Sequence, residues 1–137
     1  MASWEPSFRR GPYGLVMNDS AEVMPIKNQH RENDRSKSLS AVTVRAQAEA
    51  VLKKAGGDIS NSKHLFGCFE LQFGCFRGMS FKWILENSPG YDGWLVAESE
   101  KDLANPKESE AYGDRWVNKM AFKKYVEFFE EGRELVA

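Results

Sequence analysis

The aromatic residues of this 137-residue chain are concentrated in one short stretch. Residues 66–94 hold eight of its seventeen phenylalanines, tryptophans and tyrosines. Aromatic side chains dominate small cores because each can bury on the order of 150–250 Å². A chain of this length supports one ordinary domain rather than two. We therefore expect a single core that forms around residues 66–94.

A short repeat lies within this stretch, because the tetrapeptide Phe-Gly-Cys-Phe at residues 66–69 occurs again at residues 73–76. Two copies of four residues are far too short for a solenoid, whose units have about 20 residues or more. The pattern predicts a β-hairpin with a strand over Cys68–Phe76 and a returning strand over Met79–Phe81. A turn at Arg77-Gly78 would join them, because glycine tolerates the positive φ of a tight turn.

A helix is predicted before this hairpin. Ser40 is a good N-cap, and the helix is expected to run to Ala55, where Gly56-Gly57 ends it. Its apolar face would be formed by small and β-branched residues, namely Val42, Val44, Ala46, Ala48, Ala50, Val51 and Leu52.

Two short helices are predicted after the hairpin. The first covers Lys82–Glu86, and the second begins at Ser88-Pro89, where serine caps and proline occupies the first helical position. The spacing of Tyr91 and Trp94 places them on one face of the second helix. We expect both of these rings, and Trp83, to lie in the core.

A longer helix is predicted at the end of the chain. Residues 86–114 carry eight acidic and two basic side chains, which favours a solvated connection. Asn118 would then cap a helix that ends at Gly132. Its apolar stripe consists of Met120, Phe122, Tyr125, Val126 and Phe129.

Residues 1–39 are predicted to be a disordered arm, because prolines, glycines and the polar run at 28–35 leave little apolar surface to bury. A local apolar patch leaves two other arrangements open, a strap packed on the domain or a segment that orders on a partner. Residues 40–137 would form a single α+β domain, a small β-hairpin packed against several helices.

Composition excludes several classes of protein. Nineteen basic and twenty acidic residues give a net charge of −1, which argues against a strongly basic polyanion binder. No apolar run approaches the ~18 residues of a membrane span. The first residues show no secretory signal, so we expect an intracellular protein, cytoplasmic or nuclear, in which Cys68 and Cys75 stay reduced.

Residues 73–95 resemble a known small module. Phe73-Gly74, Arg77-Gly78, Trp83–Asn87 and Gly90–Leu95 follow the pattern F-G-[KR]-[YH]-K-G…W-L-L-E-N…G-Y-x-x-W-L. This module is found C-terminal to exodeoxyribonuclease X-type exonucleases and, in longer versions, in uncharacterised animal proteins. Those longer versions are often followed by N-K-x-x-F-x-x-Y-x-x-x-F, which residues 118–129 match.

The resemblance implies a fold of one hairpin and helices, in which Gly74 and Gly78 shape the turn and Phe73, Trp83, Tyr91 and Trp94 pack. It does not imply nuclease activity, because the catalytic acidic residues of those exonucleases belong to a separate domain that this chain lacks. The family's basic residue after F-G is replaced by Cys75.

Catalysis and metal binding are not expected. His64, Cys68 and Cys75 offer three zinc ligands, with His30 as a fourth, but no C-x-x-C or H-x-x-x-H pair is present. Neither cysteine has the electropositive setting of a reactive thiolate. Phosphate-binding and nucleophile-elbow motifs are missing from the sequence. The sequence thus predicts no enzyme activity, cofactor or metal.

Two binding functions remain. The first is a recognition or scaffold module that contacts another protein, with a homodimer as one form of such contact. The second is a weak accessory module for single-stranded nucleic acid, in which Phe69 and Phe76 stack on bases while Arg77 and Lys82 meet phosphates. These four residues are the predicted contact site in either case.

Overall fold

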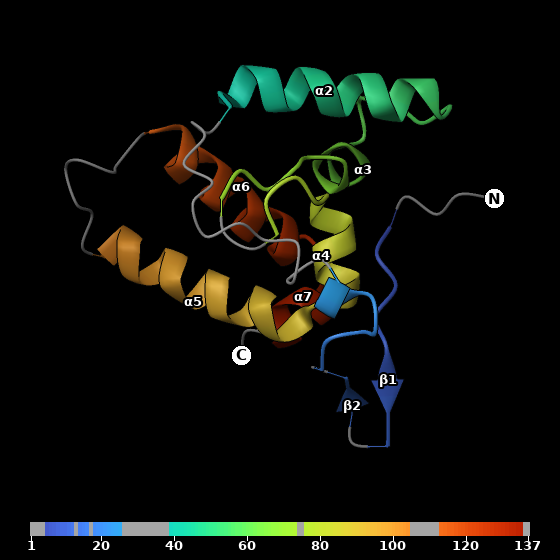
Figure 1. Ribbon diagram of the computed structural model, residues 1–137, viewed down its shortest axis with the longest axis vertical. Coiled ribbons are helices and arrows are strands. Elements are labelled where there is room, and N and C mark those ends of the chain that lie inside the picture. Colours follow the sequence, from blue (N-terminus) through green and yellow to red (C-terminus); the bar gives the residue numbers. More distant parts are fainter. Residues whose placement is uncertain are drawn as a thin grey trace.

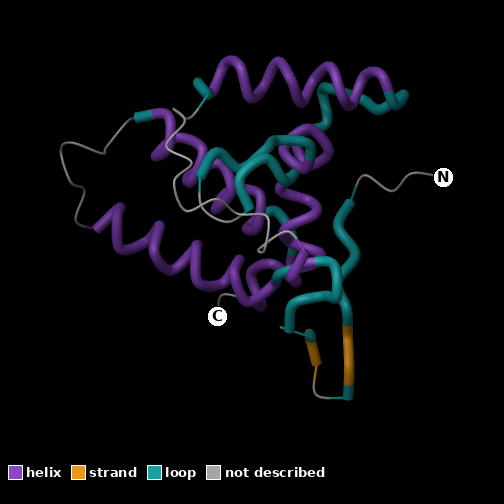
Figure 2. Tube along the Cα trace, viewed as in Figure 1, coloured by secondary structure: helices purple, strands orange, loops and turns teal. Residues whose placement is uncertain are grey.

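Helix α6 (Asp114–Glu127) runs through the middle of the molecule, and each of the other named helices packs against it (Figure 1). The computed structural model describes residues 5–12, 14–16, 18–25, 39–73, 76–104 and 113–135. Within them it shows an α+β fold that is mostly helical (Figure 2). Around α6 lie α2 (Ala41–Lys54), α3 (Ser62–Gly67), α4 (Phe81–Asn87), α5 (Pro89–Ala104) and α7 (Glu130–Leu135).

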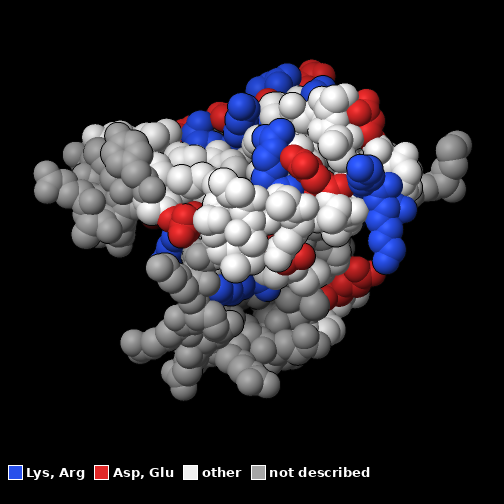
Figure 3. Space-filling model, turned by 90° about the horizontal axis from the view of Figure 1, so that it is seen from above, with Lys and Arg blue, Asp and Glu red and all other residues white. Residues whose placement is uncertain are grey.

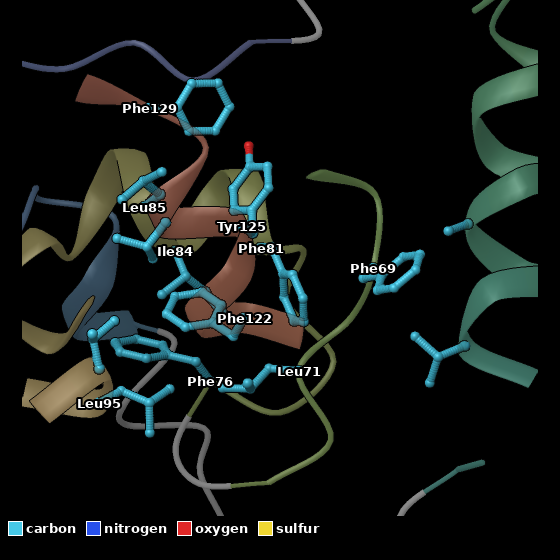
Figure 4. Packing of buried hydrophobic residues seen from close by; sticks show 14 of the residues in the cluster. Phe69, Leu71, Phe76, Phe81, Ile84, Leu85, Leu95, Phe122, Tyr125 and Phe129 are labelled. Atoms are coloured by element: carbon cyan, nitrogen blue, oxygen red, sulfur yellow. The ribbon is translucent and has the colours of Figure 1, made fainter. Parts of the chain in front are cut away.

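The core forms where the predicted apolar stripe of α6 meets the aromatic residues of the middle of the chain. Phe122 and Tyr125 pack on Phe81, with ring centroids 5.0 and 6.1 Å from the Phe81 centroid. Val126 and Phe76 are also completely buried in this cluster (Figure 4). The stripe is confirmed at Phe122, Tyr125 and Val126, because a 3.6-residue period turns these side chains to one side of the helix. Met120 is half-buried, and Phe129 is buried just beyond the end of α6.

The start predicted for this last helix is wrong. Helix α6 begins at Asp114, four residues before Asn118, and Gly113 occupies its N-cap without a side-chain hydrogen bond. Asn118 lies inside the helix, and its side chain bonds to the backbone of residues 70–72 instead of capping. Gly132, expected to end the helix, lies inside α7, where a Cβ would come 2.0 Å from the Val126 carbonyl oxygen.

The hairpin predicted over residues 68–81 is also wrong. This region forms a turn with one antiparallel bridge between Glu70 and Ser80, and Gly78 takes the expected positive φ of 88°. The bridge is flanked by backbone hydrogen bonds from the Phe81 N–H to the Phe69 carbonyl oxygen (2.8 Å) and from the Leu71 N–H to the Met79 carbonyl oxygen (3.0 Å). The main-chain N–H of Gln72 donates to the Asn118 Oδ1 atom of α6 (2.8 Å). Residues 74–75 lie outside the described residues.

The strands that the structure names in the described residues lie in the N-terminal segment. β1 (Arg10–Gly11) pairs antiparallel with β2 (Gly14–Leu15), with Arg10 opposite Leu15. The described residues 5–25, which we call the strap, contact the helices: Val23 is completely buried, and the Phe8 ring lies 6.3 Å from that of Phe129. These are the contacts of a packed strap, one of the arrangements the sequence left open; residues 26–38 lie outside the described residues.

Helix α2 agrees with its prediction at both ends. The Ser40 hydroxyl accepts a hydrogen bond from the Thr43 amide (3.3 Å), and Gly56 has a φ of 85°. Its buried face is narrower than predicted, however. A single row of Val44, Ala48 and Leu52 is buried, because α2 crosses the other helices along one line.

Helix α5 extends through a stretch that was predicted to be a loop. It runs for 16 residues to Ala104, buries Leu95 and Val96, and is held to α6 by an ion pair between Asp102 and Lys119. Residues 105–112 lie outside the described residues. The prediction that Trp94 is a core residue is wrong, because this side chain is 58% exposed.

Candidate functional site

A groove lies between helix α2 and the first half of helix α6. Its enclosed volume is about 30 Å³, and its walls are mostly apolar. The residues that line it are Leu39, Ala41, Val44, Phe69, Asp114, Val117, Asn118 and Ala121. Small-molecule and cofactor sites occupy roughly 300–1,000 Å³ and enclose most of the ligand. This groove is therefore far smaller than such a site, and it has room for at most one small apolar side chain of a partner.

The helices leave this space because small residues stand where they approach. Ala41 on α2 and Ala121 on α6 do not fill the gap between the two backbones. Leu39 precedes the Ser40 cap and lines the groove together with Val44, five residues further on. This is the spacing of a hydrophobic staple, which fixes the direction in which a chain enters its helix.

A hydrogen-bonded network beneath the groove holds its two walls together. The Asn118 side chain accepts a hydrogen bond from the main-chain N–H of Gln72, and its Nδ2 atom donates one to the main-chain carbonyl oxygen of Glu70 (3.0 Å). The Gln72 side chain in turn accepts from the Leu39 amide (3.0 Å). Both side chains are buried, so the network links the start of α2 to α6 through satisfied polar groups.

Large aliphatic side chains stand exposed along the rim of the groove. Leu39 and Val117 are each 38% exposed, and the neighbouring Val42 is 79% exposed. Single exposed apolar residues are ordinary on a protein surface. Leu39 and Val117 differ from such single residues because both also line the apolar groove, which is the composition of a contact surface.

Charge around the groove is sparse. Asp114 is the charged residue that lines it, and it lies in the first turn of α6, where an acidic side chain favours the helix dipole. On the outer side of α2, Arg45 pairs with Glu49 at 3.0 Å. The face seen from above in Figure 3 shows Lys and Arg side chains interspersed with acidic and uncharged ones. This face is not a basic patch for a polyanion.

The four residues of the predicted contact site do not form one exposed surface. Phe69 is buried and points toward α2, where it lines the groove, whereas Phe76 lies beside Leu95 on the other side of the core (Figure 4). Neither ring is open to stack on a base. Arg77 is half-exposed at the turn, and the Lys82 ammonium is paired with Glu86 at 2.9 Å.

The thiol and imidazole of helix α3 do not form a reactive pair. Burial raises the pKa of the Cys68 thiol, and the opposing effect of Lys82 is smaller. The His64 Nε2 atom faces Glu5 of the strap at 3.8 Å. Across the described part of the chain, no three His, Cys, Asp or Glu side chains gather in a way that could hold a metal ion. Cys75 and His30, the other predicted ligands, lie outside it.

Sequence reasoning missed Leu39 and Val117, the two residues that open the groove. The staple spacing between Leu39 and Val44 was a readable signal for the first. No such signal marked Val117, because the predicted helix began one residue after it.

Comparison of the chain with protein-family models, with curated proteins and with solved structures finds no match. The likeness of residues 73–95 to the exonuclease-associated module therefore stays a prediction. Among the described residues, no helix is long and apolar enough to cross a membrane.

Proposed function

We propose that this protein is a non-catalytic recognition module that binds another protein through the groove between α2 and α6. The observation that carries the proposal is the open apolar groove with Leu39 and Val117 exposed at its rim. Partner helices commonly bind in such grooves through apolar side chains spaced three or four residues apart.

The chemistry of the groove defines the segment that fits it. Its apolar walls suit one small aliphatic anchor, and Asp114 in its lining favours a lysine or arginine next to that anchor. We therefore expect the partner to supply a short amphipathic helix with an apolar row and a basic flank. Because one carboxylate at the rim contributes little binding energy, the anchor would dominate affinity and the charge would set orientation.

A non-catalytic role is supported by the state of the reactive side chains. A nucleophilic cysteine needs a lowered pKa, and burial acts in the opposite direction on Cys68. The groove itself contains two polar side chains, of which Asn118 is occupied by the backbone of residues 70–72.

Nucleic-acid binding, the alternative from the sequence, depended on rings that are in the core. Without Phe69 and Phe76, stacking would have to come from elsewhere, and the basic side chains on the α2 face are dispersed. We keep this alternative as an outcome of the experiment rather than as a second proposal.

The test is selection of helical peptides from a display library on the folded chain, followed by titration of the selected peptide. Ala121→Leu adds three carbons to the groove wall and should weaken binding at least tenfold. Ala97→Leu, on the exposed side of α5, makes the same change away from the groove and should leave affinity unchanged. Circular dichroism would confirm that both variants fold.

Equal affinity for both variants would refute the groove as the binding site. A single-stranded oligonucleotide titrated in parallel would separate the alternative, because binding that disappears in moderate salt is typical of phosphate contacts.

A further inference from the structure

The strap is fastened at the junction between helices α4 and α5. Ser20 donates from its amide to the Asn87 carbonyl oxygen (2.8 Å), and its hydroxyl donates to Asn87 Oδ1 (2.7 Å). The buried Ser88 hydroxyl donates to Asp19 Oδ1 (2.6 Å). We call these three hydrogen bonds the clasp. They close over the first turn of α5.

A carboxyl group is enclosed beside the clasp. Asp92, in the first turn of α5, is 0% exposed, and neither of its carboxyl oxygens has a hydrogen-bond partner among the described residues. A buried carboxylate without partners or water is very unfavourable, so the group is held as a neutral acid. Burial raises the pKa of Asp92 well above its ordinary value, and the charge of Asp19 raises it further.

The groups that surround Asp92 do not offset this effect. The strap contributes Asp19, and Arg9 donates to the Asn18 carbonyl oxygen beside it. Helix α4 contributes Glu86, which is already bonded to the Ser7 amide and to Lys82.

The two C-terminal helices add no cation toward Asp92. Helix α6 contributes the buried phenol of Tyr125, whose pKa is raised by burial and then by Glu86, Cys68 and Asp92. Helix α7 approaches α5 at Gly93 with an uncharged group, the Leu135 carbonyl oxygen, which would lie 3.2 Å from a Cβ at that glycine. The acid is therefore surrounded by neutral and acidic groups, apart from Arg9 behind Asp19.

We propose that the strap is a pH-dependent latch, which stays fastened while Asp92 is protonated and releases when that carboxyl loses its proton to solvent. Ionised Asp92 would be enclosed without water beside the charge of the exposed Asp19. Opening the clasp would hydrate Asp92 at the expense of three hydrogen bonds and would leave the helices in place.

The direction of the pH effect follows from proton linkage. The fastened state holds one proton more than the released state at pH values between 3.8, the ordinary pKa of an aspartic acid, and the raised pKa of the enclosed group. In that window the ratio of released to fastened molecules rises up to tenfold per pH unit. Above the raised pKa the ratio stops changing, and acid fastens the strap.

Hydrogen exchange of the full chain between pH 5.5 and 8.5 tests the latch. After correction for intrinsic exchange, protection of the Ser20 and Val23 amides should fall by up to tenfold per pH unit, while amides in α6 keep theirs. Asp92→Asn carries no proton to lose, so protection of these two amides should become independent of pH. Glu22→Gln removes an exposed charge from the same segment and should retain the wild-type dependence.

A second variant keeps the test decisive if Asp92→Asn does not fold. Asp19→Asn removes the facing charge and lowers the pKa of Asp92, so the loss of protection should level off at a lower pH than in the wild type. The latch is rejected if wild-type protection at Ser20 does not depend on pH, or if Asp92→Asn shows the same dependence as the wild type. These residues are not groove residues, so failure here leaves the proposed function untouched.

Discussion

Helices α2 and α5 lie on different sides of α6 (Figure 1), and they depart from ordinary packing in opposite ways. On the α2 side, Leu39, Val42 and Val117 leave apolar groups in water. On the α5 side, Asp92 is a carboxyl group kept entirely out of water. Neither arrangement stabilises the fold. Such departures are expected at functional sites. Here the α2 side presents an exposed apolar surface, and the α5 side encloses a carboxyl group.

The closed side should be sensitive to truncation of its core. Phe76 is completely buried, with ring centroids 4.8 Å from that of Tyr91 and 5.8 Å from that of Trp83. Phe76→Ala should lower the free energy of unfolding by about 3–5 kcal/mol, because the lost contacts leave a cavity. Trp94→Ala, an aromatic truncation at an exposed position of the same region, should cost about 1 kcal/mol or less. Urea denaturation measures both, and similar losses would show that the closed side is not tightly packed.

The side-chain amide of Asn118 joins α6 to residues 70–72. Asn118→Ala would remove the hydrogen-bond partner that α6 supplies to the main-chain N–H of Gln72 and to the main-chain carbonyl oxygen of Glu70. We expect a loss of about 1–3 kcal/mol in unfolding free energy, the usual result when a buried polar group becomes unsatisfied. Asn61→Ala, at the half-buried N-cap of α3, removes a single cap bond and should cost about 1 kcal/mol. If Asn118→Ala cost less than Asn61→Ala, the network would not be what joins the walls of the groove.

Much of the helical structure could be predicted from the sequence, because it depends on neighbours along the chain. Ser40 and Gly56 mark α2 by local capping chemistry, and the spacing of Phe122, Tyr125 and Val126 marks the core face of α6. Each signal lies within one helix. The positive φ of Gly78 belongs to the same group, since turn chemistry is local.

What could not be predicted depends on contacts between distant residues. The main-chain N–H of Gln72 donates to the side chain of Asn118, 46 residues away, and no local pattern predicts that contact. Trp94 shares a helical face with Tyr91, but which side chains on that face are buried depends on how the neighbouring helices pack against it, and Trp94 is exposed. The groove has no sequence signature of its own, because it is the space two helices leave at Ala41 and Ala121.

The smallest expected change in stability is at the exposed rim of the groove. It can be measured by making the same substitution on the α6 wall and on the α2 wall and comparing the two variants. Val→Thr keeps the shape of the side chain and replaces a methyl by a hydroxyl. At Val117, which is partly exposed, the hydroxyl meets water, so stability should change by no more than about 0.5 kcal/mol. At Val44, which is buried, the same hydroxyl is taken from water, and the cost should be about 1–3 kcal/mol.

Thermal unfolding of the two variants gives the difference directly. Both should weaken binding of a groove-selected peptide, because both make an apolar wall polar. Equal destabilisation would mean that Val117 is as enclosed as Val44, and the α6 wall of the groove would then not be open to solvent. If Val117→Thr is as stable as the wild type and binds the peptide with unchanged affinity, Val117 is exposed as expected, but the peptide does not contact the rim of the groove at this residue.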